Sequence, residues 1–151
     1  MSRQAARYLA AGALFIVCGA IPAARVALAA DEIDVVVNKS NSVDSLTLAD
    51  VKKIFDGDKG SWSNGKRITV IMLAQGSPER DAVLHDIYKM SESDYSKYFM
   101  QASFTGKVDA PPKDDNSASQ VKQDVAGNPG AIGYVKASDV DGSVKVVCKL
   151  Q

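Results

Sequence analysis

The residues best suited to bind a ligand lie together at Gln75-Gly76-Ser77, with Arg80 three positions later. At the first turn of a helix the backbone N–H groups have no partner within the helix, and the helix dipole places a partial positive charge there. Such a helix start is a ready site for phosphate, sulfate or a carboxylate. We therefore treat Gln75, Gly76, Ser77 and Arg80 as candidate anion ligands. The alternative is that Ser77 only caps its own helix.

The elements that must position these residues can be read from the flanking sequence. Ile68–Leu73 is a short apolar run rich in β-branched residues, which predicts a buried strand. Gly76 supplies the turn because it adopts positive φ without a Cβ clash. Ser77 then stands at an N-cap position and Pro78 at the first helical position, where its missing N–H costs nothing. We predict a strand, a tight turn and a helix in immediate succession.

The chain offers little for catalysis or for metal and cofactor binding. His85 is the single histidine, and the two cysteines are Cys18 and Cys148. We expect His85 to be a surface or packing residue and Cys148 a small buried hydrophobe, because neither has a partner for acid–base or nucleophilic work. The start of a calcium-loop pattern at Asp56–Gly60 fails at its twelfth position, which is Arg67 and not a glutamate. The sequence predicts a non-enzyme without cofactor or metal.

Residues 1–29 are typical of a bacterial export signal. Basic residues at the start precede an apolar segment, Leu9–Ile21, which is too short to span a membrane, and Ala27-Leu28-Ala29 fits a cleavage site. A lipoprotein signal at Cys18 is the other interpretation, but Val17 stands where a small residue is expected. We expect a cleaved signal peptide (1–29), a single domain (30–151), and localisation in the periplasm.

The charge balance excludes partners that need a basic surface. The chain has 18 basic and 18 acidic side chains, and removal of residues 1–29 takes away three arginines and no acid. The remaining 15 basic and 18 acidic side chains give a net charge of −3. This charge disfavours nucleic-acid binding and a polybasic membrane contact.

Strands alternate with helices along the rest of the chain. We predict helices capped by Thr47, Ser77, Ser91 and Ser117, an extended loop at Ala110–Asn116, a turn at Asn64-Gly65 beside a packed Trp62, and, besides Ile68–Leu73, strands at Ile33–Asn38, Ala131–Val135 and Val144–Leu150. A glycine inside a strand, Gly133, indicates close approach of another backbone or a ligand. The pattern predicts an α/β fold, a mixed β-sheet flanked by helices.

Several motifs occur in an order that resembles the phosphate-binding receptors of bacterial ABC importers, which are type II periplasmic binding proteins. They are Leu46–Gly57, Trp62 with Asn64-Gly65, Gly76-Ser77 with Arg80, and Asn128–Val135. The resemblance covers about Ile33 to Leu150 and corresponds to one lobe of the two-lobed receptor fold. It implies a periplasmic solute-binding protein that holds phosphate in a cleft without chemistry and delivers it to an ABC permease.

The chain departs from the receptor pattern at the candidate site. Where the family has Ser-Gly-Thr, this chain has Ser77-Pro78-Glu79, and the family's ligand-pairing arginine is replaced by Leu73. Pro78 removes a backbone donor, and Glu79 brings a carboxylate close to an incoming anion. Two functions therefore stay open: a receptor-like protein that binds phosphate or another small oxyanion weakly or as a dimer, and a single-lobe interaction module that has lost its ligand and docks a periplasmic partner.

Overall fold

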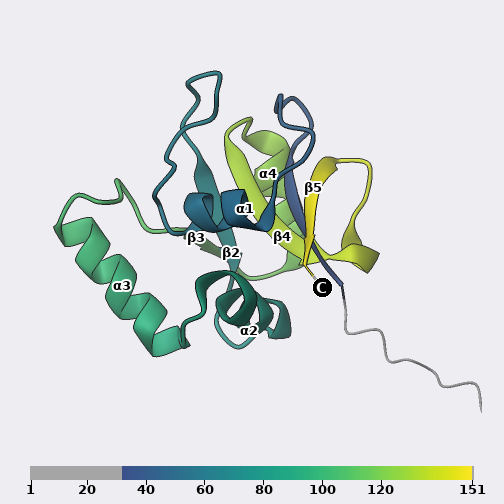
Figure 1. Cartoon of the computed structure of the whole chain (residues 1–151). Coiled ribbons are helices and arrows are strands. Elements are labelled where there is room, and N and C mark those ends of the chain that lie inside the picture. Colours follow the sequence, from purple (N-terminus) through teal and green to yellow (C-terminus); the bar gives the residue numbers. More distant parts are fainter. Residues whose placement is uncertain (1–31, 151) are drawn as a thin grey trace, which may run out of the picture.

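The computed structural model describes residues 32–150, which form a five-stranded sheet with helices on both faces (Figure 1). The strands are β1 (Ile33–Asn38), β2 (Thr69–Leu73), β3 (Lys113–Asp115), β4 (Ala131–Lys136) and β5 (Val144–Leu150). Their order across the sheet is β3-β2-β4-β1-β5. β2 runs parallel to β3 and β4, whereas β1 runs antiparallel to β4 and β5. The predicted mixed α/β sheet is confirmed. The predicted signal peptide (1–29) and Cys18 lie outside the described residues.

The helices begin at the residues that the sequence singles out. They are α1 (Leu48–Phe55), α2 (Pro78–Val83), α3 (Glu92–Phe104) and α4 (Ala118–Gly127), with a π-helical segment η1 (Leu84–Tyr88) continuing α2 and a 3-10 turn η2 (Ala137–Asp139) after β4. The side chains of the four predicted caps each accept a hydrogen bond from the backbone N–H three residues later; these caps are Thr47, Ser77, Ser91 and Ser117. The capping predictions are confirmed.

The two faces of the sheet are covered differently. Figure 1 shows α1 in front of the sheet and α4 behind it. On the α1 side, the rings of Phe55 and Tyr134 lie 6.4 Å apart. On the α4 side, a Cβ built on Gly133 would lie 2.8 Å from a methyl carbon of Val121 and 3.3 Å from one of Val125. The prediction of a close approach at Gly133 is confirmed, and the neighbour is α4.

Aromatic side chains join α1, η1 and α3. The Tyr88 ring packs edge-on against Tyr95 and Phe99, with ring centroids 5.0 and 6.1 Å apart, and its hydroxyl donates to the Phe55 carbonyl at 3.0 Å. Edge-to-face packing of this kind adds to the burial of apolar surface. On α3, Tyr95 and Phe99 are buried in the core, whereas Phe104 is 90% exposed.

The prediction that Ala110–Asn116 is a loop is wrong for its second half. Lys113–Asp115 form β3, which pairs in parallel with Ile71–Leu73 of β2. Three charged residues carry no apolar pattern, so the strand is formed by backbone pairing with an available neighbour and is not signalled by its own side chains. Pro111 and Pro112 precede the strand and fix where the pairing begins.

The turn at Asn64-Gly65 and the packing of Trp62 are as predicted. Trp62 is buried, and its indole N–H donates to the Gly130 carbonyl at 3.0 Å. Cys148 differs from expectation in degree: it is half-buried on β5 and packs against the edge of the core.

The carboxyl ends of three strands lie at the same end of the sheet. Because β2, β3 and β4 are parallel, their carboxyl ends meet at this edge, where the Ala74–Gly76 turn follows β2. Ile33, at the start of β1, is paired there with both Lys136 and Leu150. Ligands of open α/β sheets bind outside the carboxyl ends of the strands.

Candidate functional site

The start of α2 has the geometry that the sequence predicts. Gly76 has φ of +85°, and a Cβ there would meet no atom within 4 Å. Ser77 has extended backbone angles, and its Oγ accepts from the Arg80 N–H at 3.3 Å. Pro78 is the first residue of the helix. The turn therefore requires glycine for its backbone conformation and not for space.

Backbone amides at this helix start remain available to a ligand. Within the described part of the chain, the N–H groups of Gln75, Gly76 and Glu79 donate no hydrogen bond. Gln75 and Gly76 are exposed and Ser77 is half-buried. Donors of this kind at a helix start attract an anion.

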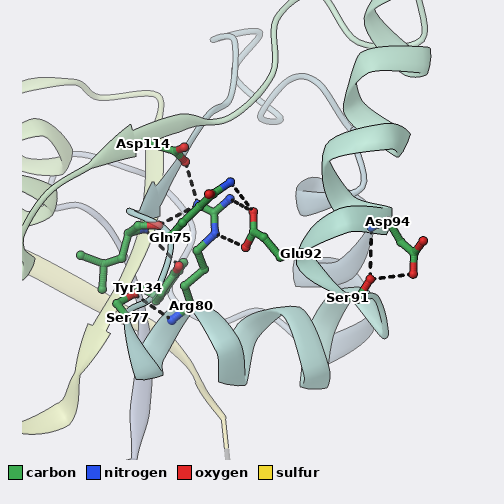
Figure 2. Close-up of polar contacts among 9 residues, drawn as sticks. Gln75, Ser77, Arg80, Ser91, Glu92, Asp94, Asp114 and Tyr134 are labelled. Carbon is green, nitrogen blue, oxygen red and sulfur yellow. Dashed lines mark hydrogen bonds and ion pairs between the residues drawn. The ribbon is translucent and has the colours of Figure 1, made fainter.

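The Arg80 side chain is buried inside the protein and does not extend to the exposed surface of the helix start. It is 1% exposed, and Figure 2 shows its guanidinium pointing at Glu92 and Asp114. Nε and Nη2 donate to the two Glu92 oxygens at 2.8 Å each, and Nη1 donates to the Asp114 carboxylate at 2.8 Å and the Leu73 carbonyl at 2.7 Å. The guanidinium also lies 5.0 Å from the centre of the Tyr95 ring. In this structure Arg80 binds protein groups from α3 and β3.

The charges of this cluster stabilise one another. Burial by itself would lower the pKa of Arg80, but its hydrogen bonds to Glu92 and Asp114 outweigh burial and raise it. The hydrogen bonds from Arg80 also hold the pKa of Glu92 below its ordinary value. Both side chains are therefore charged at neutral pH, and the pair ties the start of α2 to the start of α3.

Gln75 belongs to the same cluster. Its side-chain amide donates to Glu92 at 2.9 Å, so Glu92 receives hydrogen bonds from both Gln75 and Arg80 (Figure 2). A cavity of about 290 Å³ lies beside Gln75 and Arg80, with Tyr95 and Met100 of α3 in its wall. Of the four candidate ligands, Gln75, Gly76 and Ser77 thus line the exposed turn, and Arg80 supports it from inside.

Glu92 and Asp114 are the site residues that sequence reasoning missed. Asp114 falls in the segment predicted to be a loop, and Glu92 is the first helical residue after the predicted cap Ser91. A buried arginine needs carboxylate partners, but no local signal says that Arg80 is buried. Only the pairing of β3 with β2 brings Asp114 next to Arg80.

The carboxylate of Glu79, which the sequence places close to an incoming anion, has a cationic neighbour. Lys136 at the end of β4 lies 3.4 Å from it. This pairing offsets part of the repulsion that Glu79 would exert on an anion at Gly76 and Ser77.

The residues considered for chemistry are not brought together. His85 is 83% exposed at its side chain and contacts Asp86 at 2.7 Å, while Cys148 lies on β5 at the other end of the sheet order. Among residues 32–150, no group of three or more histidine, cysteine or acidic side chains is placed to hold a metal ion. Within the same range, no helix is both long enough and apolar enough to cross a membrane.

Comparison with known proteins identifies a family and several solved structures of the same fold. Residues 3–146 match the family model of the PBP superfamily domain. No curated protein sequence matches the chain. Among solved structures, the chain is 28% identical, with a TM-score of 0.62, to a protein from Clostridium perfringens described as a phosphate ABC transporter substrate-binding protein and solved with bound phosphate. It is 26% identical, with a TM-score of 0.58, to an ABC-type phosphate transport receptor from Vibrio cholerae.

These matches cover 78% of this chain but only 44% and 45% of those two structures. PstS from Borrelia burgdorferi, at 14% identity and a TM-score of 0.57, shares the fold over 46% of its length. The chain therefore spans less than half of the length of each of these three solved structures.

Proposed function

The chain belongs to the PBP superfamily domain family, and from this premise we propose that it is an exported, non-catalytic solute-binding protein of the ABC-importer receptor class. Its ligand is phosphate or another small oxyanion, bound at Gln75, Gly76 and Ser77. The observation that carries this proposal is the set of backbone N–H groups at Gln75, Gly76 and Glu79 that donate no hydrogen bond within the described part of the chain. The bound phosphate of the Clostridium perfringens structure supports the choice of ligand.

Arg80 takes a different role in this proposal from that of the three turn residues. Its guanidinium is used by Glu92, Asp114 and the Leu73 carbonyl, so it acts as a positioning residue. It holds Gln75 through Glu92 and keeps the turn against the end of β2. Loss of Arg80 would weaken anion binding by loosening the turn, not by removing a contact to the anion.

The helix start needs a second wall to enclose its ligand. Binding sites for small molecules usually bury about 70–90% of the ligand, and Gln75 and Gly76 are exposed. We place this wall against the carboxyl edge of the sheet and assign it to a second copy of the chain or to another polypeptide. Without this second wall, we expect a Kd in the millimolar range, which corresponds to a binding free energy of about −4 kcal/mol.

The direct test is thermal unfolding of the mature chain with and without phosphate. Saturation at about 100 times Kd adds about 2.7 kcal/mol of stability if the ligand binds only the folded state. Ser77→Asp is the informative variant, because aspartate caps a helix as well as serine but places a carboxylate at the proposed anion position. Ser117→Asp makes the same change at the start of α4 and is the matched control. Sulfate and acetate in parallel define which anions bind.

Export and the transport partner belong to the same proposal. We propose that residues 1–29 are removed on export and that the mature protein works in the periplasm with an ABC permease. N-terminal sequencing of protein recovered from the periplasm tests the first part, with Ala30 as the expected first residue. A chain that keeps Met1 would contradict it.

One observation favours a second function, an interaction module. Leu73 occupies the position of the family's ligand-pairing arginine, and its side chain is buried. A lobe that has lost its ligand would use the exposed surface around Ser77 to dock a periplasmic protein. Ser77→Trp would then change the set of proteins recovered from periplasm, whereas an unchanged set together with phosphate binding supports the receptor.

A further inference from the structure

A second cavity lies beside the amino end of β2, and it shares Phe99, Pro111 and Pro112 with the cavity beside Gln75 and Arg80. It has a volume of about 310 Å³ and is bounded by the end of α1, the first half of β2 and the segment that leads from α3 into β3. Figure 1 shows this segment returning from α3 to β3 beside α1. The length of β2 separates this cavity from the candidate anion site. Thr69 and Val70 at the start of the strand line the cavity, whereas the Gln75–Ser77 turn follows its other end.

The cavity has a structural cause in the pairing of β2 with β3. The pairing covers only Ile71–Leu73, and the two residues before β3 are Pro111 and Pro112, which have no N–H to donate. The first half of β2 is therefore left without a strand neighbour on this side. Thr69 and Val70 stay half-buried, and the space beside them is open.

The floor of the cavity is apolar. It is formed by Ile54, Phe55, Val70, Phe99 and Val108. The wall at Val108 is held close to α1, because a Cβ built on Gly57 would lie 2.3 Å from a Val108 methyl carbon, and Gly57 has φ of +82°. An aromatic or aliphatic group placed on this floor would leave water at a gain of about 25 cal/mol per Å².

Charged side chains also line the cavity. Four basic side chains and one acidic side chain line it, namely Lys59, Arg67, Lys107, Lys113 and Asp109. Arg67 pairs with Asp109 at 3.1 Å, Lys107 pairs with Asp58, and Lys113 pairs with Asp115 at 2.9 Å and with Asp124. Asp58, Asp115 and Asp124 are not part of the lining. Lys59 forms no side-chain hydrogen bond or ion pair with the described residues. Three of the four basic side chains thus have carboxylate partners, and the Lys59 ammonium group is left for an anionic ligand.

We propose that this cavity is a second binding site, separate from the oxyanion site, for a small organic anion with an apolar body. The apolar group occupies the floor between Phe55 and Val70, and the carboxylate, sulfonate or phosphate end faces Lys59 and Arg67. Inorganic phosphate is excluded as the occupant because it has no apolar surface for this floor. The volume is at the lower end of the range found for small-molecule sites.

The test uses two fluorescent probes that share one skeleton. 8-Anilinonaphthalene-1-sulfonate carries a sulfonate, and N-phenyl-1-naphthylamine lacks it. We expect the sulfonate probe to bind the folded mature chain with a stoichiometry of one. The variant Gly60→Trp places an indole on the cavity wall, where a built Cβ meets nothing within 4 Å, and should weaken binding at least about tenfold. Gly127→Trp is the matched control, because Gly127 also has open space and lies outside the lining.

The variant Lys59→Gln tests whether the ligand is an anion. This test can be interpreted even if the Gly60→Trp variant does not fold. It should weaken the sulfonate probe about two- to fivefold and leave the uncharged probe unchanged, since an exposed charge pair contributes up to about 1 kcal/mol. Equal binding of the sulfonate probe by wild type and a folded Gly60→Trp overturns the site. An equal effect of Lys59→Gln on both probes, or no effect on either, overturns the anionic ligand class.

Competition separates this inference from the proposed function. Millimolar phosphate should displace no more of the sulfonate probe than chloride of equal ionic strength, and Ser77→Asp should bind the probe as wild type does. Displacement specific to phosphate would mean that the two sites are one, and it would overturn the inference while leaving the oxyanion site in place.

Discussion

Replacement of Arg80 by methionine tests whether this side chain is the internal support of the helix start. Arg80 is 1% exposed and donates four hydrogen bonds, two to Glu92 and one each to Asp114 and the Leu73 carbonyl. Methionine keeps an unbranched apolar stem in the same space, so the change removes the guanidinium with little loss of packing.

The expected loss follows from what is left behind. Removing one partner of a buried ion pair costs about 3–5 kcal/mol when the other charge remains buried. Here the Glu92 and Asp114 side chains are 32% and 50% exposed and regain water, which favours the lower end of that range. The Leu73 carbonyl loses the hydrogen bond that it accepts from Arg80. We expect Arg80→Met to lower the free energy of unfolding by about 3 kcal/mol, or the melting temperature by roughly 10 °C.

The assay is urea unfolding followed by circular dichroism, with Arg67→Met as the matched control. Arg67 also pairs with a carboxylate, Asp109, but the two side chains are 70% and 73% exposed. The control should change stability by no more than about 0.5 kcal/mol. Arg80→Lys keeps the charge but not the two-pronged contact with Glu92 and should fall between the two. Equal stability of Arg80→Met and Arg67→Met would refute the reasoning.

Two further predictions concern pH and backbone conformation. Because the pKa of Glu92 is lower in the folded state, its contribution to the free energy of unfolding is fully present above about pH 4.5 and is lost as pH falls through the folded pKa. In thermal melts, the stability difference between wild type and Glu92→Gln should therefore shrink between pH 6 and pH 3. A constant difference would contradict the pairing of Glu92 with Arg80. Gly57→Ala should destabilise the protein by about 1–3 kcal/mol more than Gly65→Ala. Both glycines have positive φ, but only at Gly57 would a built Cβ lie 2.3 Å from a Val108 methyl carbon. Equal losses in urea titrations would show that the Val108 side chain moves aside without a loss of stability.

The features that the sequence predicts well are those with local causes. The four helix caps depend on side chains that bond their own backbone three residues away, so Thr47, Ser77, Ser91 and Ser117 could be identified without the fold. The boundaries of β1 and β5 follow from their apolar runs, and Gly133 signals a close neighbour because no side chain fits there.

The features that the sequence does not predict have distant causes. Lys113–Asp115 becomes a strand because its backbone meets the edge of β2, and nothing in three charged residues indicates that. The π-helical turn at Leu84–Tyr88 depends on packing against α1 and α3. The sequence predicts Arg80 as an anion ligand because it follows Gly76-Ser77 in the receptor-like motif, whereas the fold brings Glu92 and Asp114 to its guanidinium.

The most direct test of the oxyanion site is the shift in melting temperature on adding phosphate to wild type, Ser77→Asp and Ser117→Asp at constant ionic strength. We predict that phosphate raises the melting temperature of wild type and Ser117→Asp, and that the rise is absent in Ser77→Asp although its stability without phosphate is close to that of wild type. An equal rise in all three proteins, or no rise in wild type, would contradict an anion site at the start of α2.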